Sequence, residues 1–290
     1  MPDPRTEDFL HRFAVTPLGG DQFTCTCNPG WPGKAFGGQL AAQSLQAAAA
    51  TAPAGMVPWS LHMYFHAPVR ANERIDMTVE RIKDGRTTAT RQVRLHQDGS
   101  FRMTAMAAFG MPGEGPRHQW RPPEAPAPEL VPPLERIVDP TVLPAGADHV
   151  ALGYPAEALI EMRMVESAPP EGERGSFERK AWMRVLPEIP DDPLTTATTL
   201  CYLADITLGT TALEPHGGRA ATTDLQLGAI ELTLWFTGSA RLSDWCLFSQ
   251  DSSYAGGGHG LSHGAFHSAS GDVVAIAVQN ALMRSAAPPR

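Results

Sequence analysis

The chain has 290 residues, 42% of them hydrophobic, which is enough apolar material for one large domain or two ordinary ones. Its 31 acidic and 23 basic residues give a net charge of −8, which excludes a general attraction to nucleic acid or to anionic lipid. No apolar run approaches the ~18 residues that cross a bilayer, and the acidic start at 1–8 is unlike a signal peptide. Four cysteines without zinc-site spacing predict free thiols, and we expect a cytoplasmic protein with no membrane or nucleic-acid partner.

The first 110 residues predict a hairpin, a helix and four further strands. Two short apolar runs around Gly19-Gly20-Asp21 predict the hairpin, and the Ala- and Gln-rich stretch 36–50 predicts the helix. Turn dipeptides such as Asp84-Gly85 separate the four alternating runs that follow. These runs are 61–65, 73–83, 87–97 and 101–109.

The same order of elements returns after a break. Residues 111–144 are rich in proline and weakly periodic, which predicts an extended linker. A second helix is expected over 193–209, because Asp192 suits an N-cap and Pro193 suits the first helical position. The hairpin and strands of this half are expected at 158–165, 177–185, 232–236, 243–254, 259–268 and 272–283.

The two halves align with each other at a nearly constant spacing. Phe65 corresponds to Phe236, 171 positions later (236 − 65), and Gly99 corresponds to Gly271, 172 positions later (271 − 99). A constant offset over four strands predicts a duplicated unit. One long helix for each meandering antiparallel sheet indicates an α+β fold in which each sheet wraps around its helix. The expected segments are an N-terminal repeat over 1–110, a Pro-rich linker over 111–150, and a C-terminal repeat over 151–290 that carries the active site.

Asp205 lies within the apolar stripe of the second predicted helix. At about 100° per residue it shares a face with Leu194, Cys201 and Leu208. A carboxylate on such a face is costly to bury unless something hydrogen-bonds it. The pattern therefore fits a core acid with satisfied hydrogen bonds, a partly wet helix face, or a functional acid.

Gln279 interrupts the last predicted strand in the same way. The residues that share its face are small: Ala275, Ala277 and Ala281. It fits either a core amide bonded to the backbone or a partner for Asp205. Residues 34–70 contain no Asp or Glu, and the position equivalent to Gln279 in the first half is Ala107. The acid and the amide are missing together, which predicts one site per chain, in the second half.

Two other motifs match the residue types of known catalytic or metal-binding signatures but lack the surrounding structure that those signatures require. The segment 260–264 reads Gly-Leu-Ser-His-Gly, yet a nucleophilic Ser262 would need a helix after it and then an acid followed by a histidine, and no His follows Asp272. His259, His263 and His267 recur every four residues, but their glycine-rich surroundings do not favour a helix and no acidic ligand accompanies them. We therefore expect no metal and no cofactor.

Several short motifs together resemble the acyl-CoA thioesterase II family. They are Phe36-Gly37-Gly38-Gln39, His62-x-Tyr64-Phe65, Asp84-Gly85, Leu213-x-Pro215-His216-Gly217 and Val278-Gln279-x-x-x-Met283-Arg284. The likeness extends over nearly the whole chain. It implies a double-hotdog fold, with two hotdog units in one chain, and it implies hydrolysis of acyl-CoA thioesters.

The resemblance also implies a set of site residues. In that family an Asp, a Thr or Ser, and a Gln hold the hydrolytic water; they fall on Asp205, Ala229 and Gln279. Alanine cannot hydrogen-bond a water. Thr233 and Glu231 are expected on the same strand face as Ala229, as supporting groups.

The sequence also predicts residues that bind substrate and leaves two alternative functions open. We expect Gly37, Gly38 and His62 to contact the acyl-CoA substrate. The missing hydroxyl at Ala229 keeps open a non-catalytic or weakly active acyl-CoA-binding protein. A hotdog hydratase would need a His five residues after the acid, where this chain has Thr210. A homo-oligomer is compatible with the sequence.

Overall fold

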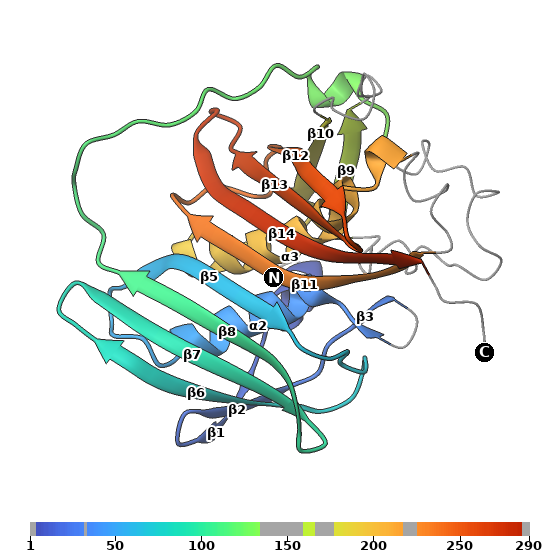
Figure 1. The fold of residues 1–290 in the computed structure, drawn as a ribbon. Coiled ribbons are helices and arrows are strands. Elements are labelled where there is room, and N and C mark those ends of the chain that lie inside the picture. The colour runs from blue at the N-terminus through green and yellow to red at the C-terminus, as the bar shows by residue number, and fades with distance from the viewer. Residues whose placement is uncertain (1–3, 32–33, 134–158, 166–176, 217–224, 286–290) are drawn as a thin grey trace.

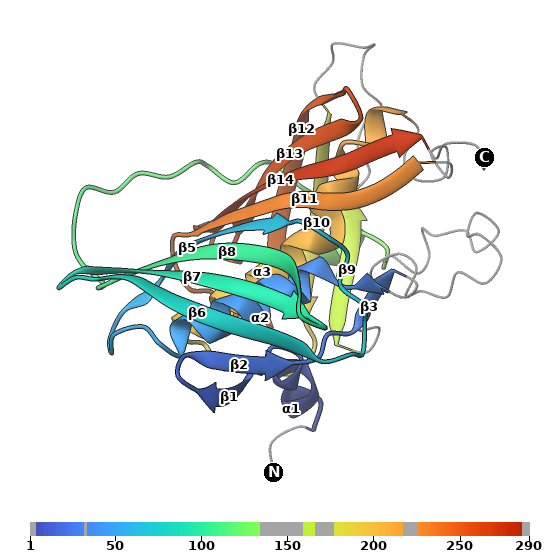
Figure 2. The same ribbon diagram turned by 60° about the horizontal axis from the view of Figure 1, so that its bottom comes forward.

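The computed structural model describes residues 4–31, 34–133, 159–165, 177–216 and 225–285. A curved antiparallel sheet of 12 strands wraps around two long helices, α2 (Gly37–Ala49) and α3 (Pro193–Thr211), which pack against each other (Figure 1, Figure 2). The buried core lies between this helix pair and the sheet. The arrangement confirms the predicted antiparallel architecture around long helices, but one continuous sheet takes the place of the two separate sheets that the sequence predicted.

Each half of the chain contributes six strands, and the order within the two halves matches. From edge to centre, the first half supplies β1 (Thr16–Gly19), β2 (Gln22–Cys25), β6 (Ile75–Asp84), β7 (Thr88–Gln97), β8 (Ser100–Gly110) and β5 (Val57–Phe65). From edge to centre, the second supplies β9 (Ile160–Val165), β10 (Glu178–Val185), β12 (Cys246–Gly256), β13 (His259–His267), β14 (Val273–Ser285) and β11 (Leu225–Phe236). The sequence therefore predicted every one of these strands, with shifts of a few residues at most ends; the exception is β11, which begins at Leu225 and not at the predicted residue 232.

The halves meet where β5 pairs with β11 at the middle of the sheet (Figure 1). His62 lies opposite Thr233, and these two residues are separated by the 171 positions (233 − 62) that relate the halves in sequence. On either side of this pair, Leu61 lies opposite Leu234 and Met63 opposite Leu232. The apolar residues next to His62 and Thr233 thus pair across the middle of the sheet.

The two long helices begin differently. Asp192 caps α3 as predicted: its carboxylate accepts hydrogen bonds from the backbone N–H groups of Leu194 and Thr195, and Pro193 takes the first helical position. Helix α2 has Phe36 at its N-cap, which supplies no side-chain hydrogen bond. The first N–H groups of α2 are therefore open to a partner from elsewhere in the chain.

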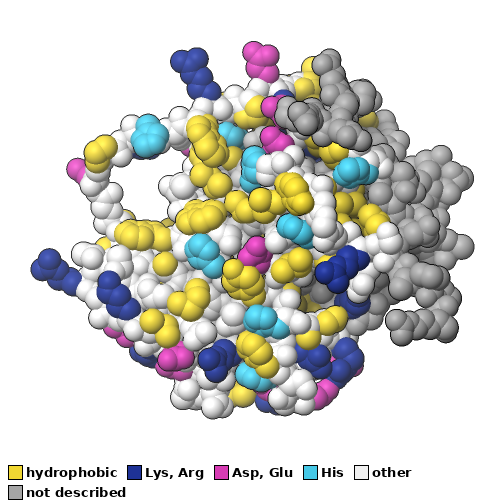
Figure 3. Space-filling model, in the orientation of Figure 1, with side chains coloured by type: hydrophobic (Ala, Val, Ile, Leu, Met, Phe, Trp, Pro, Cys, Tyr) yellow, Lys and Arg dark blue, Asp and Glu magenta, His cyan; other side chains and the backbone are white. Residues whose placement is uncertain are grey.

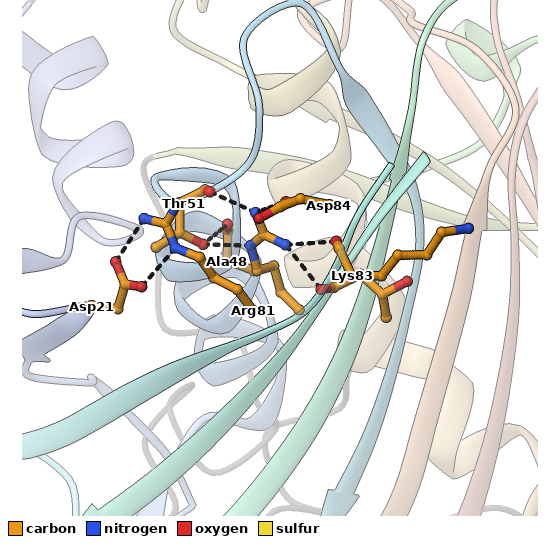
Figure 4. Close-up of polar contacts among 8 residues, drawn as sticks. Asp21, Ala48, Thr51, Arg81, Lys83 and Asp84 are labelled. Atoms are coloured by element: carbon orange, nitrogen blue, oxygen red, sulfur yellow. Dashed lines mark hydrogen bonds and ion pairs between the residues drawn. The ribbon is translucent and has the colours of Figure 1, made fainter. Parts of the chain in front are cut away.

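The other end of α2 packs onto a fully buried arginine, Arg91 of β7. Its guanidinium donates to the carbonyl oxygen of Thr51 at 2.8 Å and to the Asp84 carboxylate at 2.5 Å (Figure 4). A cation is favourable there because the helix dipole is negative at its C-terminal end. Nearby, Arg81 and Asp21 form a second ion pair closer to the surface (Figure 4).

The remaining elements are short. They are α1 (Pro4–His11), the two-stranded sheet of β3 (Pro29–Trp31) and β4 (Lys34–Ala35), and the 3₁₀ turns η1 (Pro128–Leu130) and η5 (Glu214–His216). The sequence did not predict α1. Within the described part of the predicted linker, residues 111–133, η1 is the only regular element, and the segment runs as a strap along the outside (Figure 1).

Parts of two predicted features lie outside the described residues. The linker beyond residue 133 and Gly217 of the family motif lie outside them. Within them, no helix combines the length and apolar character that a membrane span requires. All four cysteines are free, as predicted.

Candidate active site

Asp205 lies in the middle of α3 and is partly buried. One carboxylate oxygen, Oδ2, accepts a hydrogen bond of 2.7 Å from the backbone N–H of Gly38. The other, Oδ1, accepts one of 2.6 Å from the side-chain Nε2 of Gln279. The acid therefore binds the open N-terminus of α2, which belongs to the other half of the chain.

Two glycines make this close approach feasible. A Cβ atom on Gly38 would lie 2.8 Å from the carbonyl oxygen of Tyr202 and 2.9 Å from the Cβ of Asp205. A Cβ atom on Gly37 would lie 2.7 Å from Oδ2 of Asp205. Any side chain at either position would push α2 away from the acid. The absence of side chains at these two positions thus lets the start of α2 come close to α3.

Gln279 is buried on the inner face of β14, directly opposite Leu232 of β11. Its oxygen Oε1 has no hydrogen-bond partner among the described residues. A Cβ atom on Gly209, one turn beyond Asp205 in α3, would lie 3.0 Å from this oxygen. The amide therefore lies along α3, with its nitrogen on Asp205 and its oxygen beside Gly209.

The protonation of Asp205 is set by competing influences. Burial raises its pKa above the ordinary value, while the hydrogen bonds from Gln279 and from the Gly38 backbone act in the opposite direction. Burial prevails, and the pKa is raised. A carboxylate with a raised pKa is a stronger base than an exposed one, which suits it to accept a proton from a bound water.

A cavity of about 410 Å³ opens beside Asp205 and Gln279. Most of its wall is apolar, with contributions from both halves: Phe36, Leu40, Phe65, Met103, Ile206 and Ile230. Lys34 and His66 are polar residues of the same wall. An apolar chamber with a few polar groups suits a ligand that has a hydrocarbon part and a charged part.

Comparisons with known proteins show the family to which the chain belongs. Residues 28–110 match the family described as acyl-CoA thioesterase N-terminal domain, and residues 154–282 match the family described as acyl-CoA thioesterase. An acyl-CoA thioesterase 2 from Haemophilus influenzae is 30% identical over 250 residues, which cover 86% of this chain and 87% of that protein. The chain belongs to the acyl-CoA thioesterase II family. It is a thioester hydrolase.

Solved structures show the same family and its fold. The acyl-CoA thioesterase II from Mycobacterium marinum is 28% identical, with a TM-score of 0.79 over 95% of this chain and 97% of that one. A hotdog-fold protein from Alicyclobacillus acidocaldarius is 22% identical, with a TM-score of 0.75 over 97% of this chain and 99% of that one. The fold is therefore a hotdog fold.

This thioesterase carries Ala229 where the family resemblance places a hydroxyl. Ala229 lines the cavity beside Asp205. It lies opposite Ala281 on β14, and residues opposite each other on paired strands share a face, so Ala229 points inward. The missing hydroxyl would thus have faced the acid.

The expectation that Thr233 and Glu231 share the face of Ala229 is wrong. The register of β11 shifts between Ala229 and Glu231, so Ile230 is an extra, bulged residue. Glu231 consequently lies opposite Asn280 on the outer face and accepts a hydrogen bond from it at 3.3 Å. Thr233 contacts His62 at 3.4 Å on that outer face. Neither side chain reaches the cavity.

His62 is also misplaced by the sequence prediction. Its neighbours in β5, Leu61 and Met63, are buried against the helices, so His62 points outward, where it packs edge-on against Trp235. Figure 3 shows hydrophobic and His side chains gathered on this outer face of the sheet. His62 does not line the cavity of the thioesterase. Burial lowers its pKa.

The serine and histidine motifs both lie on strand β13. The segment 260–264 is part of strand β13, which is not the turn that a nucleophilic serine requires. His259 contacts Asn280 at 3.0 Å. Within the described ranges, no group of three or more His, Cys, Asp or Glu side chains is placed to hold a metal ion. The sequence missed the apolar cavity wall and the role of Gly209, because both depend on contacts between distant segments.

Proposed function

We propose that this thioesterase hydrolyses acyl-CoA with a water molecule held by Asp205 and Gln279. The observation that carries the proposal is the double hydrogen bonding of the Asp205 carboxylate beside an apolar cavity, with the acid fixed by Gly38 and Gln279. The cavity wall suits the acyl chain of the substrate. Lys34 is a cation in that wall of a chain that is otherwise strongly acidic, and it suits the charged CoA part.

In the proposed reaction Asp205 acts as the general base. The water oxygen attacks the thioester carbonyl carbon while its proton passes to the carboxylate. The C–S bond then breaks, the acid product forms, and the CoA sulfur leaves as a thiolate that takes up a proton. The N–H of Gly37, at the first turn of α2 and in the cavity wall, would stabilise the negative charge on the carbonyl oxygen.

A second candidate function rests on Ala229. With no hydroxyl at this position, one hydrogen bond to the water is absent, and loss of such a bond slows comparable reactions roughly ten- to a thousand-fold. An acyl-CoA-binding protein with weak or no hydrolysis would have this site. The geometry of Asp205 and Gln279 favours hydrolysis, because a binding protein has no use for a buried carboxylate of raised pKa.

The test is release of free thiol from a panel of acyl-CoAs, from short to long acyl chains. We expect turnover by the wild type and a loss of about 100-fold or more in Asp205→Asn, because the base is removed. Asp191→Asn, at an exposed position two residues from the helix start, is the matched control and should retain full activity. Turnover that survives in Asp205→Asn contradicts the mechanism. Measurable binding without turnover of any acyl-CoA by the wild type supports the second function.

We further propose that the chain consists of two hotdog repeats, 1–110 and 151–290, joined by the linker 111–150. The matching strand order of the halves and the 171-residue relation at the β5–β11 pair support this division. We also propose a cytoplasmic location, which the four free cysteines support because thiols persist in a reducing compartment. Homo-oligomerisation stays a prediction.

A further inference from the structure

Ser262 lies beside the proposed catalytic amide. It belongs to β13, where its Cα lies opposite that of Gln279 in β14. Cross-strand partners share a face of the sheet, and their Cβ atoms lie about 5 Å apart. Both side chains face the helices and are almost completely buried, with exposed fractions of 1% for Ser262 and 2% for Gln279.

Both side chains also have an unused hydrogen-bonding group. The hydroxyl of Ser262 has no partner among the described residues, and neither has the oxygen Oε1 of Gln279. Buried polar groups without partners are uncommon, and two on neighbouring residues of one face are complementary: a hydroxyl can donate and an amide oxygen can only accept. The long glutamine side chain and a rotating hydroxyl can bridge the distance between such partners.

We propose that Ser262 is a positioning residue for hydrolysis: its hydroxyl donates to Oε1 of Gln279 and thereby keeps the amide nitrogen turned toward Asp205. Without that donor, the amide can rotate by half a turn and present its oxygen to the acid. An oxygen in that position would repel the carboxylate form and would accept a hydrogen bond from the protonated form. Ser262 therefore favours the ionised acid, which is the form that can act as a base.

The role differs from the one suggested by the Gly-x-Ser-x-Gly letters around Ser262. The serine sits on a strand and does not attack the substrate. It acts on the site through Gln279, which already donates to Asp205 at 2.6 Å. This inference rests on the proposed function of the Asp205–Gln279 pair.

Other groups around Asp205 also influence its pKa. Burial is the main influence on its pKa, and the two hydrogen bonds from Gln279 and Gly38 oppose it. The Cys27 thiol, packed at the start of α2, is close enough to interact with the Asp205 charge. Lys34 and His66 share the cavity wall. All of these groups remain unchanged when Ser262 is substituted, so a change in the titration of Asp205 reports on the amide.

The experiment is a carbon-13 NMR titration of the Asp205 carboxyl group, assigned with Asp205→Asn, in the wild type and in Ser262→Ala. We expect Ser262→Ala to raise the pKa of Asp205 by about half a unit to one unit, the effect of one hydrogen bond. Ser262→Thr keeps the hydroxyl and should restore the wild-type value. Ser252→Ala is the matched control: Ser252 is the next residue across the sheet from Ser262, and its hydroxyl already donates to Leu261.

The kcat/KM of each variant against pH is measured in parallel. We expect the acid limb of the Ser262→Ala profile to move upward by the same amount as the NMR pKa. An unchanged pKa in a folded Ser262→Ala protein overturns the proposal, as does a shift of equal size in Ser252→Ala. If Ser262→Ala fails to fold, Ser262→Cys, a weak donor of similar size, should give a smaller upward shift, and no shift there overturns the proposal.

The titration also separates this inference from the proposed function. A wild-type protein that releases no thiol from any acyl-CoA contradicts hydrolysis. The NMR pKa of Asp205 would still show whether Ser262 holds the amide, because that measurement needs no turnover.

Discussion

The carboxylate of Asp205 accepts a hydrogen bond from the backbone N–H of Gly38, so an acid in the second half of the chain caps the helix of the first half. The positive end of a helix dipole is a favourable partner for a carboxylate. Asp205 therefore joins the two halves as well as lining the cavity. The same carboxylate accepts a hydrogen bond from Gln279. A substitution at Gly38, Asp205 or Gln279 should therefore alter the hydrogen bonding of the other two residues.

Substitution of Gly38 by alanine should disrupt both activity and stability. Its Cβ would lie closer than 3 Å to backbone and side-chain atoms of α3, so the helices must separate. We expect a loss of about 1–3 kcal/mol in unfolding free energy, measured by urea denaturation, and a large loss of turnover. Gly238→Ala is the control, because a Cβ there meets no atom within 4 Å. Equal effects of the two substitutions would contradict the close-packing argument.

Restoring the missing hydroxyl should accelerate hydrolysis. Ala229 faces the cavity beside Asp205, so Ala229→Thr places a hydroxyl where it can bind the water. We expect kcat to rise about ten-fold or more. Ala229→Val has the shape of threonine without the hydroxyl and should bring no gain. If valine accelerates the reaction as much as threonine, the effect comes from filling the cavity and not from a hydrogen bond.

A second carboxylate beside Asp205 should move the pH profile. In Gln279→Glu the two acids would lie in hydrogen-bonding distance, and like charges at that distance raise the pKa of one of them. The acid limb of kcat/KM should therefore shift to higher pH by about one unit or more. Gln279→Met removes the amide without adding charge and should shift the limb less. A profile that stays in place in Gln279→Glu would show that Gln279 is not next to the base.

The charge of Asp205 should reduce the stability of the fold above its pKa. Because its folded-state pKa is raised above the ordinary 3.8, its favourable contribution is present below that value and is lost as the pH rises through the folded pKa. Asp205→Asn should therefore gain stability relative to the wild type as the pH increases. Urea denaturation at a series of pH values measures this difference, with the exposed Asp191→Asn as control. A difference that is constant with pH would be inconsistent with the raised pKa.

Arg91 should matter more for stability than its neighbour Arg81. Arg91 is fully buried and satisfies the carbonyl oxygen of Thr51 at the end of α2, so Arg91→Met leaves buried acceptors without a donor. We expect a loss of about 2–4 kcal/mol in unfolding free energy. Arg81→Met breaks a half-exposed ion pair with Asp21 and should cost much less, because solvent screens such a pair. Thermal or urea unfolding of both variants compares them directly.

The sequence predicted the site best where local periodicity carries the information. The helical stripe placed Asp205 toward the core, and strand alternation placed Gln279 on the inner face; both placements are confirmed. Alternation failed at β11, because the bulge at Ile230 reverses the faces of Glu231 and Thr233. A bulge leaves no reliable mark in the order of residues, since it depends on how neighbouring strands pair.

Apart from the Asp205–Gln279 pair, the contacts between distant segments of the site were not predicted from the sequence. Nothing near Gly38 in the chain indicates that its N–H binds a carboxylate that lies 167 residues away. The outward position of His62 likewise depends on which face of β5 meets α2 and α3. These relations arise from packing, which local propensities do not encode.

The β5–β11 pairing has one more consequence for a protein whose two halves form a single chain. In an assembly of two identical subunits, an acid facing the helix pair would occur twice, and the energetic penalty of two charges in the interior would be doubled. Here the first half has Ala107 where the second has Gln279, and α2 contains no acidic residue. Covalent fusion thus allows an asymmetric interior: one half holds an acidic centre, while its counterpart is free to be an ordinary, well-packed support.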